Sequence, residues 1–575
     1  MKTVFAAINA KYVHTNLAVR YMQCLAEQHG GYETEFVEYT INHRILQLMR
    51  EIYLLKADCI VFSCYIWNIQ MVLELCEELK KVSPNCKIVL AGPEVSYDSE
   101  QLLEKYPFVD AVIRGEGEPV LIPFLEWVNG VCTAEQVPSL SWRSENGINS
   151  TQSAPLPSLD VLPFPYKDLN ELGGRILYFE ASRGCPFRCG YCLSSIGTGV
   201  RFMPLEQVFA AMDIFLANKV RQVKFVDRTF NCNKNYALAI WKYLSEHDNG
   251  VTNFHFEIAG ELLDDETMDF LKTVRKEQFQ FEVGVQSTNN ETLAGITRKT
   301  HIPSLFEICK KIDSFGNIHQ HLDLIAGLPY EDKKSFANSF NDVYALRPQQ
   351  LQLGFLKVLK GSAIHRQKQE FGIIYTTRAP YEVMATKWLS YDDILSLKQT
   401  EDMVERYYNS GRFSNILEQL VPLFATPFDF YEQLGSYFSQ QGHHLKNQTK
   451  EQLYTILRDF CIEKGLQFTD FMEECCLLDI CLHEKPKKLP EFIKNRLNDD
   501  YQKQIIEFYD NTENITRYLP EFEGENGKRI SRIAHLQVFA YDMASGERKT
   551  TAMLFNYEKR GLTGKAESFE IVIGD

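Results

Sequence analysis

The run Ile176-Leu-Tyr-Phe-Glu-Ala-Ser-Arg183 is followed by Gly184 and then by Cys185-Pro-Phe-Arg-Cys189-Gly-Tyr-Cys192. The first run predicts a strand, and the second places three cysteines in one short loop at the spacing C-x3-C-x2-C. Thiolates are soft ligands that hold iron–sulfur clusters, and a tight loop can aim three of them at one centre. With 15 cysteines in 575 residues, this spacing arises by chance in roughly one such chain in a hundred. The stretch therefore predicts an iron–sulfur site.

A four-iron cluster that only carries electrons takes four thiolates, and no fourth cysteine lies near this loop. The next cysteine along the chain is Cys232, beyond a predicted helix and strand. Three ligands leave one iron open to another molecule. Two other interpretations are a structural zinc site, which needs a fourth His or Cys close in space, and three unrelated thiols in a loop.

At these residues the sequence resembles the radical S-adenosylmethionine (SAM) enzymes, whose signature is C-x3-C-x-aromatic-C, with Tyr191 in the aromatic position. The resemblance implies a [4Fe–4S] cluster held by Cys185, Cys189 and Cys192. It also implies that SAM binds the open iron through its amino and carboxylate groups. Reductive cleavage of SAM would then give a 5′-deoxyadenosyl radical that abstracts a hydrogen atom.

Composition sets the bounds for the whole chain. The length suggests about three or four domains. A hydrophobic content of 45% and a net charge of 61 − 76 = −15 are typical of a globular protein with an acidic surface, and they argue against broad nucleic-acid binding. No apolar run reaches the roughly 18 residues of a membrane helix. Cysteines in a long chain that opens on a predicted strand indicate reduced thiols, so we expect a cytoplasmic protein with no membrane partner.

Residues 1–130 alternate apolar strands and amphipathic helices, which predicts a doubly wound parallel sheet. Ligands of such sheets bind beyond the carboxyl ends of the strands. The expected strands are Thr3–Ala10, Glu33–Tyr39, Cys59–Trp67, Lys87–Gly92 and Ala111–Arg114. The candidate binding residues at their ends are His14, Asn16, Ser63, Cys64, Tyr65, Gly92, Pro93, Glu94, Gly115, Glu116 and Gly117.

As a set, these strand ends resemble the cobalamin-binding domain that precedes the radical SAM core in one large enzyme class. Taken singly, each glycine can equally serve only a tight turn. Domains of this kind that place a histidine on cobalt carry D-x-H-x-x-G after the first strand. The matching window here is Tyr12-Val-His14-Thr-Asn-Leu17, which lacks the aspartate and the glycine. The resemblance therefore implies cobalamin bound base-off, without a protein histidine on cobalt.

Residues 131–175 are rich in proline and serine and contain one predicted short strand, Ser139–Arg143, which indicates a linker. From 176 to 360 the alternation resumes with a longer period and predicts a partial TIM-like (β/α)6 barrel with its site at the carboxyl ends of the strands. The expected strands are Ile176–Ser182, Gln222–Val226, Asn253–Ala259, Phe279–Val285, Ile318–Ile325 and Gln350–Leu356.

Polar residues and glycines follow these strands in the order of the radical SAM motifs. The resemblance implies that the backbone near Asp227, Thr229 and Phe230 binds the SAM amino group, with Glu257 at the end of the next strand. The resemblance also implies that Glu282, Gln286 or Ser287 contacts the ribose of SAM. Arg298 would pair with the carboxylate of SAM as a charge-assisted fork. Ile325 to Gly327 would lie against adenine. The other interpretation of these residues is structural: a surface ion pair for Arg298, fold-supporting carboxylates for Glu257 and Asp323, and a strand-ending turn at Gly327.

Residues 361–575 predict a mostly helical region that ends in strands. Helical spacing covers Tyr391–Ser410, Ser414–Leu423, Tyr431–Gln440 and Glu451–Lys464, and the expected strands are Ile533–Tyr541, Thr551–Tyr557 and Ser568–Ile573. Cys475, Cys476 and Cys481 fall in an apolar helical stretch, which favours buried, inert thiols over a second metal site. This region is similar to that of other bacterial radical SAM proteins with cobalamin domains.

The leading hypothesis is a cobalamin-dependent radical SAM enzyme that transfers a methyl group to an unactivated carbon. Its substrate would be a small molecule, and its electron donor a flavodoxin- or ferredoxin-type protein. Alternatives are radical rearrangement, cyclisation or reduction without methyl transfer, and a non-catalytic cobalamin- or redox-sensing iron–sulfur protein. Methylthiolation of tRNA is disfavoured, because Cys24, Cys59, Cys64, Cys76 and Cys86 are scattered over separate elements.

Overall fold

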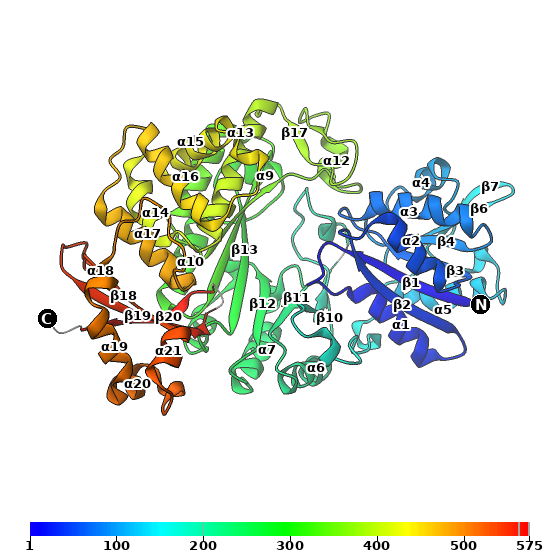
Figure 1. Ribbon diagram of the computed structural model, residues 1–575. Helices are drawn as coiled ribbons and strands as arrows, with labels where there is room; N and C mark the ends of the chain where they lie inside the picture. The colour runs from blue at the N-terminus through cyan, green and yellow to red at the C-terminus, as the bar shows by residue number, and fades with distance from the viewer. Residues whose placement is uncertain (198, 562–563, 573–575) are drawn as a thin grey trace. The chain divides into compact units, whose positions relative to one another are not determined.

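The computed structural model describes residues 1–197, 199–561 and 564–572 (Figure 1). The chain divides into two compact units. The first contains residues 1–332 and 354–390, and the second contains residues 333–353 and 391–575. Across the described residues, no helix is both long enough and apolar enough to cross a membrane.

The first unit begins with a sheet in the order β2-β1-β3-β4-β5-β6-β7. Strands β1 to β5 are parallel, and β6 and β7 are added antiparallel at one edge. The elements are β1 (Lys2–Asn9), α1 (Leu17–His29), β2 (Glu33–Thr40), α2 (Ile45–Leu54), β3 (Cys59–Ser63), α3 (Ile69–Val82), β4 (Lys87–Ala91), α4 (Ser99–Lys105), β5 (Ala111–Ile113), α5 (Leu121–Val128), β6 (Leu140–Ser144) and β7 (Gly147–Ser150).

Helices cover both faces of this sheet. Ala6 and Ile8 of β1 pack into one core with α2 and α3, while Phe5 and Ala7 pack into another with α1 and α5. Strand β3 is buried along its whole length for the same reason. The predicted doubly wound parallel sheet is confirmed, and its faces leave no room for a ligand except beyond the strand ends.

The segment predicted as a linker contributes to this sheet. The expected single strand near Ser139–Arg143 is present as β6, and it pairs with β5 through Ala111↔Trp142 and its neighbours. A second strand, β7, follows after a tight turn. A short alternating run beside prolines does not reveal its pairing partner, because the contacts that order it come from a strand about 30 residues earlier.

The second sheet of the first unit contains parallel strands in the order β14-β13-β12-β11-β8. Its elements are β8 (Leu177–Phe179), α6 (Leu205–Ala217), β11 (Gln222–Phe225), α7 (Lys234–Glu246), β12 (Asn253–Ile258), α8 (Asp265–Leu271), β13 (Phe279–Gln286), α9 (Asn290–Gly295), α10 (Ile302–Phe315) and β14 (His319–Ala326). The next strand, β15 (Gln350–Phe355), straddles the boundary between the two units. These positions confirm the predicted strands of the barrel sheet.

Side chains on the two faces of the barrel sheet differ in character. Phe256 and Phe281 are fully buried and contact Trp241 of α7 at ring distances of 5.9 and 5.4 Å. Glu257 and Glu282, one residue further along the same strands, keep part of their surface exposed. Because side chains alternate along a strand, one face is an apolar core under the helices and the other is polar.

Helices form most of the second unit, as predicted. They are α11 (Lys333–Tyr344), α13 (Tyr391–Met403), α14 (Ser414–Leu420), α15 (Pro427–Gln440), α16 (Lys450–Glu463), α17 (Asp470–His483), α18 (Leu497–Asp500), α19 (Gln502–Asp510), α20 (Thr512–Tyr518) and α21 (Gly527–Ile533). The helix predicted over Tyr391–Ser410 continues beyond Met403 as a π-helix, Val404–Asn409. The three cysteines of α17 are buried.

An antiparallel sheet, β18-β19-β20, ends the second unit. Its strands are β18 (Ala534–Phe539), β19 (Thr551–Arg560) and β20 (Ala566–Ile571). The predicted strands at Ile533–Tyr541 and Thr551–Tyr557 are confirmed. The third begins two residues earlier than predicted, and its predicted last residue, Ile573, lies outside the described residues.

Candidate active site

The three cysteines lie in the loop between two short antiparallel strands, β9 (Ser182–Arg183) and β10 (Arg201–Phe202). We call residues 182–202 the cysteine hairpin. Gly184 opens the loop with φ = +109°, a conformation that residues with a side chain rarely adopt. A Cβ at Gly184 would lie 2.4 Å from the carbonyl oxygen of Gly199. The neck of the hairpin is therefore too narrow for any residue but glycine.

Backbone hydrogen bonds fix the middle of the cysteine hairpin. Gly190 donates its N–H to the carbonyl of Ile296 at 2.8 Å, and its own carbonyl accepts from Ile364 at 2.9 Å. Cys192 donates to the carbonyl of Cys189 at 3.1 Å. These bonds hold the turn between the second and third cysteines in one place, as a preorganised cluster site requires.

Two polar side chains approach the sulfur atoms. Thr229 Oγ1 lies 3.3 Å from Cys185 Sγ, and Arg298 Nη1 donates to Cys189 Sγ at 3.6 Å. Cys189 is buried, while Cys185 and Cys192 are half-buried. Burial raises the pKa of the Cys189 thiol, and the positive charge of Arg298 opposes that rise. A cation beside the Cys189 sulfur favours its thiolate, which is the form that binds iron.

The zinc alternative requires four ligands around one ion. Among the described residues, no three His, Cys, Asp or Glu side chains are grouped closely enough to hold a single metal ion. The cysteines of a four-iron cluster bind different irons and stand further apart than the ligands of one ion.

Residues after β11 support the cysteine hairpin. Asp227 is buried and accepts hydrogen bonds from the Ala181 N–H at 3.1 Å and from Ser182 Oγ. Burial raises the pKa of this carboxyl to about 7. Phe230 is buried in the apolar core under α7. Tyr191, in the hairpin itself, is half-buried, and burial raises the pKa of its hydroxyl.

Strand β13 ends in a bulge at Gln286. The register with β14 shifts between Gly284 and Gln286, and Gln286 has φ = +71°. A Cβ at Gly284 would lie 2.1 Å from Gln286 Nε2, so the glycine makes room for this amide. Arg298 Nη2 donates to the Gly284 carbonyl. Within the described residues, Gln286 Oε1 and Arg298 Nε are buried without a hydrogen-bond partner.

Other predicted contacts on β13 and β14 are used inside the fold. Ser287 Oγ donates to Glu331 Oε1 at 2.6 Å. Ile325 is half-buried, and Gly327 has φ = +89°. A Cβ at Gly327 would lie 2.6 Å from Val383 Cγ1, in strand β17 (Val383–Ala385), which pairs with β16 (Ile374–Tyr375).

The two predicted glutamates contact cations and a histidine on the polar face of the barrel sheet. Glu282 Oε2 lies 3.0 Å from Lys224 Nζ and 2.9 Å from His255 Nε2. Glu257 Oε2 lies 3.6 Å from Arg228 Nη1. Burial opposes ionisation of Glu282, but the hydrogen bond from His255 and the charge of Lys224 hold its pKa well below the usual range. Glu282 is therefore a carboxylate whose Oε2 already has two partners in the protein.

At the carboxyl edge of the N-terminal sheet, His14 and Asn16 have partners in the protein. His14 Nδ1 lies 2.7 Å from the hydroxyl of Tyr178, and His14 forms an isolated bridge with Ile176. Burial and two nearby lysines lower the pKa of His14. Asn16 caps α1, because its Oδ1 accepts from the Val19 N–H at 3.2 Å.

The ends of β3 and β4 pack against each other. Gly92 has φ = +106°, and a Cβ there would lie 2.6 Å from the Cys64 carbonyl oxygen. Cys64 is fully buried and Ser63 nearly so, so neither thiol nor hydroxyl lies on the open edge. Tyr65 stacks on Trp67 with ring centroids 4.3 Å apart and planes at 8°.

Large apolar side chains are exposed on several loops of this edge. Tyr12 and Val13 after β1, Trp67 after β3 and Tyr97 after β4 have exposed fractions of 66%, 38%, 45% and 44%. Gly115 after β5 has φ = +73° and nothing within 4 Å of its Cβ position. The edge thus presents open apolar surface, which typically marks a binding region.

Carboxylates of the β5 loop bind the base of the cysteine hairpin. Arg183 lies 2.7 Å from Glu116 and 2.8 Å from Glu118, and it also contacts Glu180 at 2.7 Å. Arg201, on the other strand of the hairpin, pairs with the same Glu116. Glu116, which was predicted to contact cobalamin, therefore forms an ion pair with each strand of the cysteine hairpin.

The β4 loop makes a second connection of this kind. Glu94 is buried, accepts a hydrogen bond from the Tyr381 hydroxyl, and lies 3.5 Å from Lys360 Nζ. Lys360 also pairs with Asp98 at 2.7 Å. Burial raises the pKa of Glu94, while Tyr381 and Lys360 lower it. Gly117 packs beside Met22, whose sulfur would lie 3.2 Å from a Cβ at that position.

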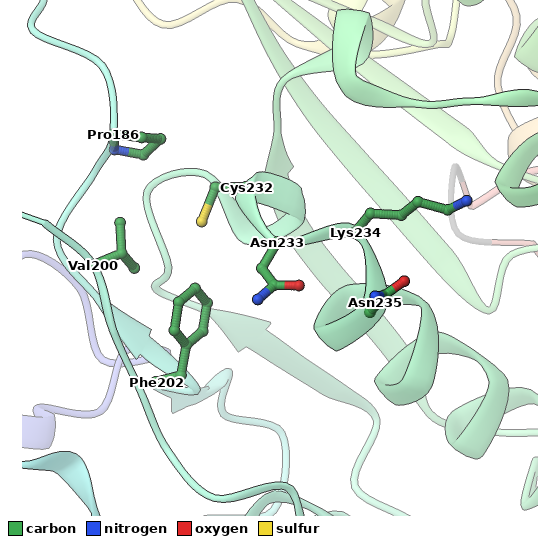
Figure 2. A pocket seen from close by; sticks show the side chains of 7 residues that line it. All are labelled: Pro186, Val200, Phe202, Cys232, Asn233, Lys234 and Asn235. Atoms are coloured by element: carbon green, nitrogen blue, oxygen red, sulfur yellow. The ribbon is translucent and has the colours of Figure 1, made fainter.

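A surface pocket of about 600 Å³ lies beside the cysteine hairpin (Figure 2). It is lined by Pro186, Val200, Phe202, Cys232, Asn233, Lys234 and Asn235. Figure 2 shows the Cys232 sulfur directed toward Val200 and Phe202, while Lys234 extends away from them. Burial raises the pKa of the Cys232 thiol to about 11, so it stays protonated at neutral pH.

The sequence predicted the two glutamates within β12 and β13, but it did not predict the basic residues that contact them or lie beside them on the neighbouring strands. Lys224, His255 and His321 lie on the same polar face as the two glutamates, and His321 Nε2 is 3.2 Å from Asp323 Oδ1. The signal was present as a period of two in Phe254-His-Phe-Glu-Ile258, where apolar and polar residues alternate.

Comparison with known families divides the chain in the same order as its sheets. Residues 3–122 match the family described as B12 binding domain, and residues 179–343 match the Radical SAM superfamily. Residues 369–555 match a family described as "Protein of unknown function (DUF4080)". The chain thus combines a B12 binding domain with a radical SAM domain, which confirms the resemblance drawn from the sequence.

Several characterised and uncharacterised proteins are similar to this chain. The cobalamin-dependent radical SAM methyltransferase TokK of Streptomyces tokunonensis is 24% identical over 50% of this chain and 45% of its own length. The uncharacterized methyltransferase PH0819 of Pyrococcus horikoshii is 32% identical over 28% of this chain and 37% of its own length. The matched stretch spans less than half of each of these relatives.

Solved structures share the fold. The cobalamin-dependent S-adenosylmethionine radical enzyme OxsB, with aqua-cobalamin and SAM bound, superposes with a TM-score of 0.59 at 14% identity, covering 81% of this chain and 75% of that one. The radical SAM methyltransferase TsrM of Kitasatospora setae, with tryptophan and a SAM analogue bound, superposes with a TM-score of 0.56 at 17% identity. The superposition covers 65% of this chain and 77% of TsrM. At this identity the likeness establishes the architecture alone.

Proposed function

We propose that this chain is a cobalamin-dependent radical SAM enzyme that transfers a methyl group to an unactivated carbon of a small-molecule substrate. The observation that carries the proposal is the pairing of Glu116, in the B12 binding domain, with Arg183 and Arg201 of the cysteine hairpin. A loop suited to an iron–sulfur cluster is thus attached to the domain suited to a methyl carrier. Similarity to TokK, which is named as a methyltransferase of this class, supports the same reaction.

The residues present fit a cluster and SAM. Cys185, Cys189 and Cys192 would hold the cluster and leave one iron for SAM. The buried, unpartnered Gln286 Oε1 and Arg298 Nε, among the residues described here, fit a polar ligand at the end of β13. Arg298 offers the planar donor geometry that a carboxylate accepts.

The N-terminal edge fits a broad, flat and largely apolar ligand such as the corrin ring. Exposed aromatic side chains on the loops after β1, β3 and β4 support this assignment. The window around His14 lacks the aspartate and glycine of domains that place a histidine on cobalt, which supports binding of cobalamin without a protein histidine on cobalt. Ser63, Cys64 and Asn16 would act by shaping the edge, since their side chains are buried.

When bound, the cluster with SAM would supply one-electron cleavage to a reactive carbon radical, and cobalamin would supply the methyl group. The chain itself positions these groups. Arg298 favours the thiolate of Cys189, Thr229 contacts Cys185, and the hairpin neck at Gly184 limits the movement of the cysteine loop. A flavodoxin- or ferredoxin-type protein would supply the electron.

The test is anaerobic reconstitution with iron, sulfide and hydroxocobalamin, followed by dithionite and SAM. We expect 5′-deoxyadenosine together with S-adenosylhomocysteine as cobalamin is methylated. Cys185→Ala, Cys189→Ala and Cys192→Ala should each abolish 5′-deoxyadenosine, whereas Cys232→Ala should retain iron and activity. An intact cluster that yields no 5′-deoxyadenosine would favour a sensing protein. Production of 5′-deoxyadenosine without S-adenosylhomocysteine would favour rearrangement, cyclisation or reduction.

A further inference from the structure

Residues 354–390 carry a charge opposite to that of the chain as a whole. They contain four lysines and two arginines against two glutamates, so their net charge is 6 − 2 = +4, whereas the whole chain carries −15. The segment includes α12 (Ala363–Gln367). A basic segment in an acidic protein concentrates positive potential in one place, which steers an acidic partner to that place.

Helix α12 contacts the middle of the cysteine hairpin. Ile364 donates its N–H to the carbonyl of Gly190 at 2.9 Å, and Gly190 donates its own N–H to the carbonyl of Ile296. Arg366 lies two residues after Ile364, and Lys299 lies three residues after Ile296. Because three residues span at most about 11 Å of chain, the backbone of each cation is close to the cysteine loop.

The cations of α12 and of the residues just after it are bound to uncharged groups. Arg366 is exposed, and its Nη1 donates to the Gly361 carbonyl at 2.8 Å. Lys368 Nζ lies 3.0 Å from His365 Nε2. Burial and the charges of Lys368 and Lys360 lower the pKa of His365, so this imidazole is neutral. At these contacts the charges of Arg366 and Lys368 stay uncompensated, and they can attract an acidic surface.

A single side chain connects the cysteine loop with the surface on this side. Arg298 Nη1 donates to Cys189 Sγ at 3.6 Å, and Arg298 and Lys299 also line a surface pocket of about 370 Å³. In the pocket of Figure 2, by contrast, Lys234 is paired with two carboxylates at the start of α8. Uncompensated positive charge and a short path to the cysteines therefore occur together beside α12.

We propose that Lys299, Arg366 and Lys368 form a basic surface on which an acidic electron-carrier protein of flavodoxin or ferredoxin type docks. One electron leaves the reduced carrier and enters the cluster, so each encounter oxidises the carrier by one electron. This inference rests on the proposed function, because reductive cleavage of SAM is what requires a carrier. Electron-transfer encounters bury less than about 1,200 Å², so a small acidic protein can contact the basic surface and avoid the acidic remainder of the chain.

The first experiment compares two reductants of the reconstituted holoenzyme in the presence of SAM. Flavodoxin, kept reduced by NADPH and flavodoxin reductase, is the acidic carrier, and dithionite is a small reductant that needs no docking surface. The double variant Arg366→Glu/Lys368→Glu should raise the flavodoxin concentration for half-maximal 5′-deoxyadenosine formation at least tenfold. It should leave the rate with dithionite unchanged, and Arg366→Lys should respond as the wild type does.

The double variant Lys242→Glu/Lys272→Glu is the matched control, because it changes the charge equally at exposed positions in α7 and just after α8. It should keep the wild-type response to flavodoxin. A wild-type response from Arg366→Glu/Lys368→Glu with full iron content overturns the proposal, and so does flavodoxin that supports no activity where dithionite does. Absence of 5′-deoxyadenosine with both reductants instead shows that the proposed function itself is wrong.

The second experiment measures binding without turnover. Biolayer interferometry with oxidised flavodoxin and the holoenzyme should give a Kd that rises at least tenfold between about 0.1 M and about 1 M salt, since the Debye length falls from about 10 Å to about 3 Å. Arg366→Glu/Lys368→Glu should bind weakly at both salt concentrations. Binding of flavodoxin that does not depend on salt overturns the proposal. Binding of bulk tRNA that this variant abolishes, with flavodoxin binding unchanged, assigns the surface to nucleic acid and also overturns it.

Discussion

The two parallel sheets of the first unit offer a ligand different positions. Strands β1 and β3 of the N-terminal sheet are buried along nearly their whole length, because helices cover both faces. Strand β13 of the barrel sheet alternates between buried and half-buried residues over most of its length, and β12 has one half-buried residue, Glu257. A ligand of the first sheet can therefore lie only beyond the strand ends, whereas a ligand of the second can also lie on a face. The same strand–helix repeat thus produces two kinds of site.

The largest effect should come from the packed face of the barrel sheet. Phe281→Ala removes a fully buried ring that contacts Trp241, and we expect it to lower the free energy of unfolding by about 4 kcal/mol. Urea denaturation measures this change. Phe281→Leu, which keeps most of the volume, should cost less than about 1.5 kcal/mol. A loss below about 1 kcal/mol for the alanine variant would mean that the two faces do not differ as described.

A slightly smaller effect is expected at the edge of the N-terminal sheet. Arg183→Met leaves Glu116, Glu118 and Glu180 without their shared counter-ion, which should destabilise the protein by about 3 kcal/mol and reduce the iron bound after reconstitution. Thermal unfolding and iron analysis are the measurements.

Lys167→Met is the control for the Arg183 variant. Lys167 forms an ion pair with Glu27, and the two side chains are 59% and 39% exposed. Exposed pairs contribute less than about 1 kcal/mol, so this variant should keep its stability and its iron. Equal losses in the two variants would contradict a role for the β5 loop in holding the cysteine hairpin.

The sequence predicted the strands of both sheets because each βα unit carries its own local signals. It also located the cysteine loop, since the spacing of three thiols is independent of context. It did not reveal that Glu116 holds Arg183, because the two lie 67 residues apart and each is compatible with a solvated surface. The pairing of Glu282 with Lys224 was missed for the same reason: strand register is set by the packing of the whole sheet.

Stability should depend on pH in opposite ways for Asp227, which follows a strand, and for Glu282, which lies on the polar face of the barrel sheet. Burial raises the pKa of Asp227 from 3.8 to about 7, so the stability that its protonated form contributes is complete below pH 3.8 and is lost as the pH rises through 7. Between pH 5.5 and 7 this loss amounts to about 2 kcal/mol. The pKa of Glu282 is lowered instead, so its contribution is present above pH 4.5 and is lost on acidification.

Asp227→Asn should therefore flatten the fall in stability between pH 5.5 and 8, while Glu282→Gln should flatten only the loss below pH 4.5. Urea midpoints measured across this range test both variants. If stability falls with pH as steeply in Asp227→Asn as in the wild type, the Asp227 carboxyl beside Ser182 is already ionised in the folded protein at pH 5.5.

The smallest change in stability is expected where the N-terminal sheet meets solvent. Trp67 is 45% exposed and stacks on Tyr65, so Trp67→Ala should alter the free energy of unfolding by less than about 1 kcal/mol. The same variant should bind cobalamin about tenfold more weakly, because an aromatic contact contributes roughly 1.4 kcal/mol. Spectroscopic titration with hydroxocobalamin measures the affinity.

Leu46→Ala, at a 72% exposed position on α2, is the control and should change neither quantity. The prediction depends on the burial of both sheet faces, which leaves the loops alone to bind a ligand. If Trp67→Ala lowered stability but left cobalamin affinity unchanged, the exposed aromatic side chains would belong to the fold. The exposed loops of the N-terminal sheet would then not be a ligand site, and the comparison of the two sheets would not explain where a ligand binds.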